Sequence, residues 1–70
     1  MVNTELLQAA IDDSGLKESF IAEKKLCISY QSYYNKKVGN TAFKDIEINV
    51  LCDTLGIQDE QQKKAIFFAE

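Results

Sequence analysis

The three glycines of this 70-residue chain, at positions 15, 39 and 56, constrain its fold more than any other feature. Each glycine follows a segment whose apolar residues repeat with helical spacing, and the sequence contains no proline. Glycine often ends a helix because it adopts the left-handed backbone conformation without the steric cost of a Cβ atom. We therefore predict a single domain, residues 1–70, in which glycine turns separate short helices.

The first three helices follow from apolar spacing and capping residues. Asn3 or Thr4 can cap a first helix that ends at residues 14–15, and a second apolar set over residues 16–26 predicts a helix from about Lys17. Ser29 is a strong N-cap for a third helix over about residues 29–38, because its hydroxyl can accept the free N–H groups of the first turn. Gly39 is predicted to end this helix.

The last two helices complete an all-α fold. Apolar residues from Phe43 to Leu55 predict a fourth helix, although "IEINVL" is also compatible with a strand. We favour a helix because a lone strand would have no partner for its backbone groups. Asp59 and Gln62 have the spacing of a capping box at the start of a fifth helix. The predicted fold is a compact bundle of about five short helices.

The charge is unevenly distributed in a chain whose net charge is −3. Residues 17–44 hold six lysines against Glu18 and Glu23, whereas the acidic residues dominate both ends. Within the basic region, residues 24–37 read "KKLCISYQSYYNKK", a polar and aromatic tract without an acidic residue. A local cationic face can attract a phosphate backbone over about 8–10 Å. The alternative is that these lysines only solubilise an exposed helix.

The composition argues against catalysis and metal binding. There is no histidine, and Cys27 and Cys52 are the only cysteines, so the ligands for a zinc site or a disulfide framework are missing. We expect no cofactor, no metal, no small-molecule substrate and no enzymatic activity. Both cysteines are predicted to be small buried groups in a reducing cytoplasm. No apolar run approaches the length of a membrane span, so no membrane partner is expected.

Residues 14–48, "SGLKESFIAEKKLCISYQSYYNKKVGNTAFKDIEI", resemble the helix-turn-helix of the lambda-repressor-like and Cro-like family. Ala22 matches the alanine of the first motif helix, and Ile28 and Ser29 match the entry to the second. The sequence looks most like small phage repressor-like proteins of Gram-positive bacteria, which also end in an "IFFA" segment like that at residues 66–69. The resemblance implies a transcriptional regulator that binds double-stranded DNA.

The turn departs from the family pattern. Cys27 stands where the family places glycine, and it follows Ala22 by five residues instead of four. One extra residue, Lys24 or Lys25, is therefore predicted to lengthen either the second helix or its turn. Cys27 also carries a Cβ atom where the family uses a positive φ, so the turn is either strained or follows a different path.

The resemblance places the second motif helix, at about 29–38, in the major groove. The base-contacting residues that it implies are Tyr30, Gln31 and Ser32, with Tyr34 or Asn35 one turn further. Gln31 is the strongest candidate, because a carboxamide can pair with the N6 and N7 edge of adenine for about 1–3 kcal/mol of discrimination. The alternative for Gln31 is an ordinary solvated position. Tyr33 is predicted to pack in the core instead.

The family also implies phosphate contacts from Lys17, Lys36, Lys37 and Lys44. Such contacts position a protein on DNA without reading its sequence. The chain contains no arginine, the residue that most often reads guanine, so we expect A·T-leaning recognition of modest affinity.

The C-terminal residues Ile66, Phe67 and Phe68 form a candidate dimer interface. Two adjacent helical residues point about 100° apart, so we predict that one phenylalanine packs inward and the other is exposed. A homodimer through the C-terminal helix would suit paired DNA half-sites, whereas a monomer with both rings buried is the alternative. The alternative function is a small helical protein-interaction module that acts on a host or phage regulator without binding DNA.

Overall fold

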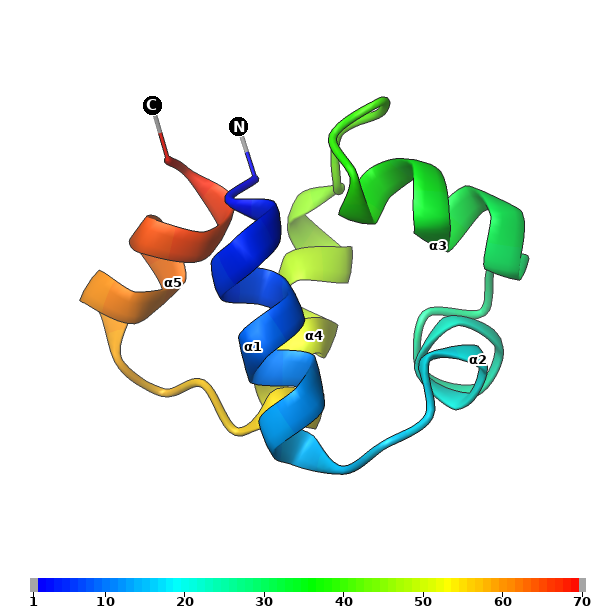
Figure 1. Cartoon of the computed structure of the whole chain (residues 1–70), viewed down its shortest axis with the longest axis horizontal. Helices are drawn as coiled ribbons and strands as arrows, with labels where there is room; N and C mark the ends of the chain where they lie inside the picture. Colours follow the sequence, from blue (N-terminus) through cyan, green and yellow to red (C-terminus); the bar gives the residue numbers. More distant parts are fainter. Residues whose placement is uncertain (1, 70) are drawn as a thin grey trace.

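The structure, a computed structural model, describes residues 2–69, and the regular secondary-structure elements in this range are all helical (Figure 1). In chain order the elements are α1 (Thr4–Ser14), α2 (Glu18–Phe20), the π-helical turn η1 (Ile21–Lys25), α3 (Tyr30–Lys37), α4 (Asp45–Leu55) and α5 (Glu60–Phe67). Helix α1 packs against α4 and α5, while α2 and α3 lie at the opposite end of the molecule from α5. The all-α prediction is confirmed, and "IEINVL" lies within α4.

The predicted caps and stops explain where most helices begin and end. The Asn3 side chain accepts the Leu6 N–H at 3.1 Å, and Asp59 accepts the Gln61 N–H at 2.9 Å. Ser29 caps α3. The three glycines have φ of 71°, 91° and 74°, the left-handed conformation that the sequence predicts for them.

The start of the second helix agrees with the prediction, and the start of α4 differs from it. Helix α2 begins at Glu18, with Lys17 as its N-cap residue. Helix α4 begins at Asp45 instead of Phe43, because the Glu47 carboxylate reaches back and accepts the Lys44 N–H at 2.8 Å. This contact satisfies one of the free N–H groups at the helix start. A lysine therefore precedes each of these two helices.

The core lies between α1, η1, α4 and α5 and also receives one side chain from α3. Its fully buried large side chains are Tyr33, Leu7, Ile11, Ile21, Leu51 and Ile66. The predicted core position of Tyr33 is confirmed, because its side chain has no exposed surface. Cys52 is buried as predicted, but Cys27 is exposed, since it lies in the turn between η1 and α3.

The two C-terminal phenylalanines face different directions. Phe67 is 5% exposed and packs edge-on against Phe43, with ring centroids 5.7 Å apart, whereas Phe68 is 51% exposed. The prediction of one inward and one outward ring is confirmed. The predicted dimer interface needs correction, because Ile66 and Phe67 are buried in the core and only Phe68 offers an exposed apolar surface.

None of the helices in residues 2–69 combines the length and the apolar character needed to cross a bilayer.

Candidate nucleic-acid interface

The turn that leads into α3 combines a π-helical segment with a left-handed residue. The Leu26 N–H donates to the Ile21 carbonyl, five residues back, at 2.9 Å, and the Ile28 N–H donates to the Ala22 carbonyl at 3.0 Å. A π-helical turn holds one residue more than the corresponding α-helical connection. Cys27 then adopts φ of 57°. The second helix therefore widens in its final turn, and the turn keeps a positive φ despite the Cβ atom of Cys27.

Helix α3 presents a polar face away from the core. Tyr33 and Lys37, one turn apart, are its buried residues. Gln31 and Ser32 are exposed on the other side, and Tyr30 and Tyr34 are 42% and 44% exposed. Four of the five residues predicted to contact bases are thus accessible to a ligand, and none of the eight residues of α3 is acidic.

The fifth predicted base-contacting residue, Asn35, is half-buried. The loop after α3 folds back onto it, since the N–H groups of Asn40 and Thr41 both donate to the Asn35 carbonyl, at 2.9 and 3.3 Å. These contacts satisfy one of the carbonyl groups that a helix leaves free at its C-terminus. Asn35 is consequently less accessible than Gln31, one turn earlier.

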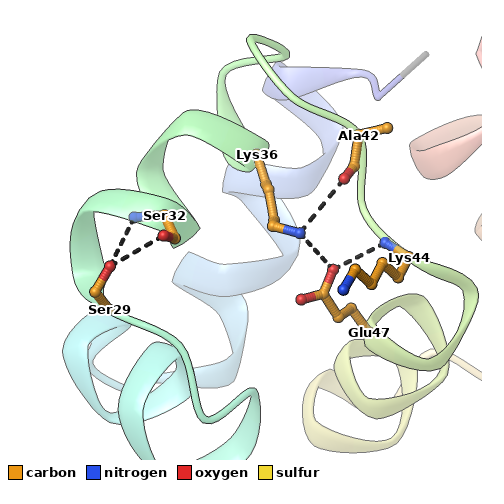
Figure 2. A network of polar contacts seen from close by, with 6 residues as sticks. All are labelled: Ser29, Ser32, Lys36, Ala42, Lys44 and Glu47. Carbon is orange, nitrogen blue, oxygen red and sulfur yellow. Dashed lines mark hydrogen bonds and ion pairs between the residues drawn. The ribbon is translucent and has the colours of Figure 1, made fainter.

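The N-terminal end of α3 has a defined hydroxyl pair. Ser29 Oγ accepts the Ser32 N–H at 3.2 Å and donates to Ser32 Oγ at 3.0 Å (Figure 2). Because the Ser32 hydroxyl accepts this bond, its own proton is free to donate outward. Ser32 therefore offers a hydrogen-bond donor on the exposed side of α3, and the next residue back in the sequence is the exposed Gln31.

Two of the four lysines predicted to bind phosphate have a different role. Lys36 Nζ lies 2.7 Å from Glu47 Oε1 on α4, and Lys37 Nζ lies 2.7 Å from Glu18 Oε1 on α2 (Figure 2 shows the first pair). Lys37 is only 7% exposed. We correct both predictions: these lysines form ion pairs that attach α3 to its two neighbouring helices, and we do not propose them as phosphate contacts.

The remaining two predicted phosphate contacts, Lys17 and Lys44, are exposed. Lys24 and Lys25, which were not among the predicted phosphate contacts, are exposed as well. Lys25 Nζ lies 5.6 Å from the centre of the Phe20 ring, within cation–π distance. Four exposed lysines are therefore present in the region that contains α2, η1, α3 and the start of α4.

The ion pairs perturb the acidity of their partners. Burial acts to raise the pKa of Glu18, but hydrogen bonds from Lys37 and Tyr33 outweigh it and the pKa is lowered from 4.5. The same balance holds for Glu47, whose pKa is lowered by Lys36 and by the Lys44 N–H despite its burial. Burial and the Glu18 carboxylate both raise the pKa of Tyr33 well above its usual range. Both carboxylates are therefore charged at neutral pH, and Tyr33 is protonated.

Sequence reasoning missed the structural roles of Glu18 and Glu47. They lie 19 and 11 residues away from their lysine partners, too far for any helical spacing rule to connect them. A partial signal existed, because Glu47 stands three residues after Lys44, the spacing of a capping box.

The fold defines the chain as a compact all-α protein with a polar, acid-free face on its third α-helix. Comparisons with protein-family models, with curated proteins and with solved structures found no match.

Proposed function

We propose that this chain is a sequence-specific DNA-binding transcriptional regulator that places α3 in the major groove. The observation that carries the proposal is the outward face of α3, where Tyr30, Gln31 and Ser32 are exposed and no acidic side chain is present. A helix of this kind can enter the major groove with its first turn against the base edges. An acidic residue on this face would repel the phosphates on both sides of the groove.

The distribution of charge supports the same proposal. Glu18 and Glu47 neutralise the two lysines of α3. Four exposed lysines lie before and after α3 in the sequence, at positions 17, 24, 25 and 44. The acidic residues that make the net charge negative lie mainly in α1 and from α4 onward. Lys17 and Lys44, the N-cap residues of α2 and α4, are the phosphate contacts that we propose.

The exposed side chains of α3 can each contact a different part of the base pairs. Gln31 can donate to and accept from one adenine, and Ser32 can donate to an acceptor on a neighbouring base. Tyr30 can pack against a thymine methyl group. These contacts predict a preference for A·T base pairs, in agreement with the absence of arginine.

An anisotropy titration with duplexes from the chain's own genomic neighbourhood tests the proposal. If Lys17, Lys44 and one or both of Lys24 and Lys25 neutralise phosphates, three or four contacts form, and log K should fall with log salt at about −0.9 per contact, hence at about −2.7 to −3.6. A scrambled duplex of the same length is the control for selectivity. A salt-independent response, or no binding to any duplex at low salt, would contradict the proposal.

We further propose that the DNA-bound form is a homodimer formed through α5, in which the exposed ring of Phe68 packs against a second copy. Two-fold pairing would place two copies of α3 for half-sites about 34 Å apart. Because Ile66 and Phe67 already belong to the core, the contact is smaller than the sequence predicts. Sedimentation velocity with and without DNA measures whether the chain is a monomer or a dimer.

A second candidate function is a protein-interaction module. A cavity of about 360 Å³ opens between the loop after α3 and the end of α5, and its apolar lining includes Val2, Phe43, Ile48, Phe67 and Phe68. Half-exposed aromatic surface beside other apolar groups is typical of an interface. A chain that binds no duplex, but whose Phe68→Ser variant loses binding to a protein regulator, would favour this function.

A further inference from the structure

A partly buried polar network joins α3 to α1 and α2. Lys37 Nζ donates to Glu18 Oε1 at 2.7 Å and to Gln8 Oε1 at 2.9 Å. The Tyr33 hydroxyl donates to the same Glu18 oxygen at 2.8 Å. Tyr33 and Lys37 are the two residues of α3 that are buried. One carboxylate oxygen of α2 therefore binds both inward-facing side chains of α3.

The network continues to the surface at both ends. Gln8 Nε2 donates to Asp12 Oδ1 at 3.0 Å, which orients the amide so that its oxygen faces Lys37. On the other side, Lys37 Nζ lies 5.5 Å from the centre of the Tyr34 ring, a cation–π contact with a side chain that is 44% exposed. A lysine ammonium group has three donors, and two of them are used by Gln8 and Glu18. The buried cation thus links α1 and α2 to an exposed aromatic ring on α3.

Stability alone does not account for a lysine at this position. Removing two charges from water costs about as much as their attraction returns, so apolar residues of similar volume are often equally stable. A hydrogen-bonded ion pair differs from an apolar contact because its geometry is directional. Bonds from one ammonium group to two helices restrict the angle at which α3 crosses them, and an apolar side chain would not.

We propose that Lys37 is a positioning residue, which sets the orientation of α3 and of the Tyr34 ring through its bonds to Gln8 and Glu18. The consequence for DNA rests on the proposed function: a face held in one orientation meets the base edges in one register. Loss of the network then reduces discrimination between DNA sequences more than it reduces affinity, because the exposed lysines that bind phosphates are untouched.

The free protein provides the first test. In ¹⁵N-detected NMR of lysine ammonium groups, the Lys37 signal should exchange its hydrogens at least about ten-fold more slowly than that of Lys17, because it is buried and hydrogen-bonded. Ring currents of Tyr33 and Tyr34 should also shift the Lys37 side-chain protons. An ammonium group that exchanges as fast as that of Lys17 would overturn the proposal, whatever the chain binds.

The second test separates positioning from a purely structural role. The double variant Glu18→Gln/Lys37→Met removes both charges, keeps an acceptor for the Tyr33 hydroxyl and keeps most of the lysine stem volume. We expect it to melt close to the wild type, whereas Lys37→Met alone, which leaves Glu18 unpaired, should melt lower. In the double variant the Tyr34 ring resonances should move and broaden.

With DNA, the double variant should lose about ten-fold in discrimination between its best duplex and a single-base variant, equivalent to one good base contact. Its affinity for a scrambled duplex should be unchanged. A double variant with wild-type stability, wild-type Tyr34 resonances and wild-type discrimination would refute the positioning role. If the wild type binds no duplex, the proposed function fails, while the exchange of Lys37 and the Tyr34 resonances still decide the positioning role.

Discussion

Glu47 Oε1 accepts hydrogen bonds from two residues at once: Lys36 Nζ on α3 at 2.7 Å and the backbone N–H of Lys44 at 2.8 Å (Figure 2). One carboxylate oxygen therefore caps α4 and attaches α3 to it. Both side chains of the ion pair are nearly buried, at 13% and 10% exposure. Glu47→Ala leaves Lys36 and the Lys44 N–H without their partner, so we expect a loss of about 2 kcal/mol in the free energy of unfolding.

Urea denaturation measures this loss. Glu23→Ala is the matched control, because Glu23 is an exposed carboxylate on η1, and a change within about 0.5 kcal/mol is expected there. Equal effects of the two substitutions would show that the contact with Glu47 contributes nothing to stability.

Acid should destabilise the fold through Glu18 and Glu47. The pKa of each is lowered in the folded chain from 4.5, so their stabilising contribution is present above the unfolded value. It is lost as the pH falls through the folded values, because the unfolded state then binds more protons than the folded state. Melting temperatures measured between about pH 5 and pH 3 should fall for the wild type and fall less for Glu18→Gln/Glu47→Gln. Parallel curves for the two proteins would contradict this origin of acid sensitivity.

Glycine at position 27 should stabilise the chain. Cys27 adopts φ of 57°, a conformation that costs a residue with a Cβ atom about 1–2 kcal/mol. Glycine removes this cost, although its greater freedom in the unfolded chain offsets about 0.5–1 kcal/mol. Because Cys27 is exposed, the substitution removes no core packing. We expect Cys27→Gly to raise the free energy of unfolding by about 0.5 kcal/mol and Cys27→Val to lower it. A glycine variant that is less stable than Cys27→Ala would argue against strain in the turn.

Gln31 and Lys44 should affect DNA binding in different ways. Gln31→Ala removes a group proposed to read bases, so it should reduce the preference among operator variants and leave binding to a scrambled duplex nearly intact. Lys44→Ala should weaken binding to all duplexes alike and reduce the salt slope by about one unit. Fluorescence anisotropy over a salt series measures both effects. Uniform losses from both substitutions would show that Gln31 is not a base-reading residue.

Phe67 and Phe68 should differ in their effects on folding and association. Phe67→Ser removes a core ring that packs on Phe43 and should cost about 3–5 kcal/mol, enough to unfold much of a small domain. Phe68→Ser removes a ring that is half exposed and should leave helicity unchanged while abolishing a concentration-dependent dimer. Circular dichroism and sedimentation velocity separate the two outcomes. A wild type that stays monomeric at high micromolar concentration, with and without DNA, would contradict the dimer.

The positions of the helices could be predicted from the sequence because their causes are local. Asn3, Ser29 and Asp59 cap helices through N–H groups two or three residues away, and the three glycines adopt the left-handed conformation that ends a helix or a turn. The burial of Tyr33 and the different directions of Phe67 and Phe68 follow from helical periodicity in the same way. The accessible residues at the start of α3 were predictable for this reason.

Only the tertiary structure decided which lysines are paired with a carboxylate and which are exposed. The sequence places Lys36 and Lys37 at the end of the polar and aromatic tract over residues 24–37, and nothing near them in the chain distinguishes them from exposed lysines such as Lys44. Their carboxylate partners come from α4 and α2, brought within 2.7 Å by the packing of the helices. Electrostatic pairing depends on distance in space, whereas helical propensity and capping depend on distance along the chain. For this reason the sequence determined where α3 lies in the chain, and the packing determined which of its side chains face outward without a partner.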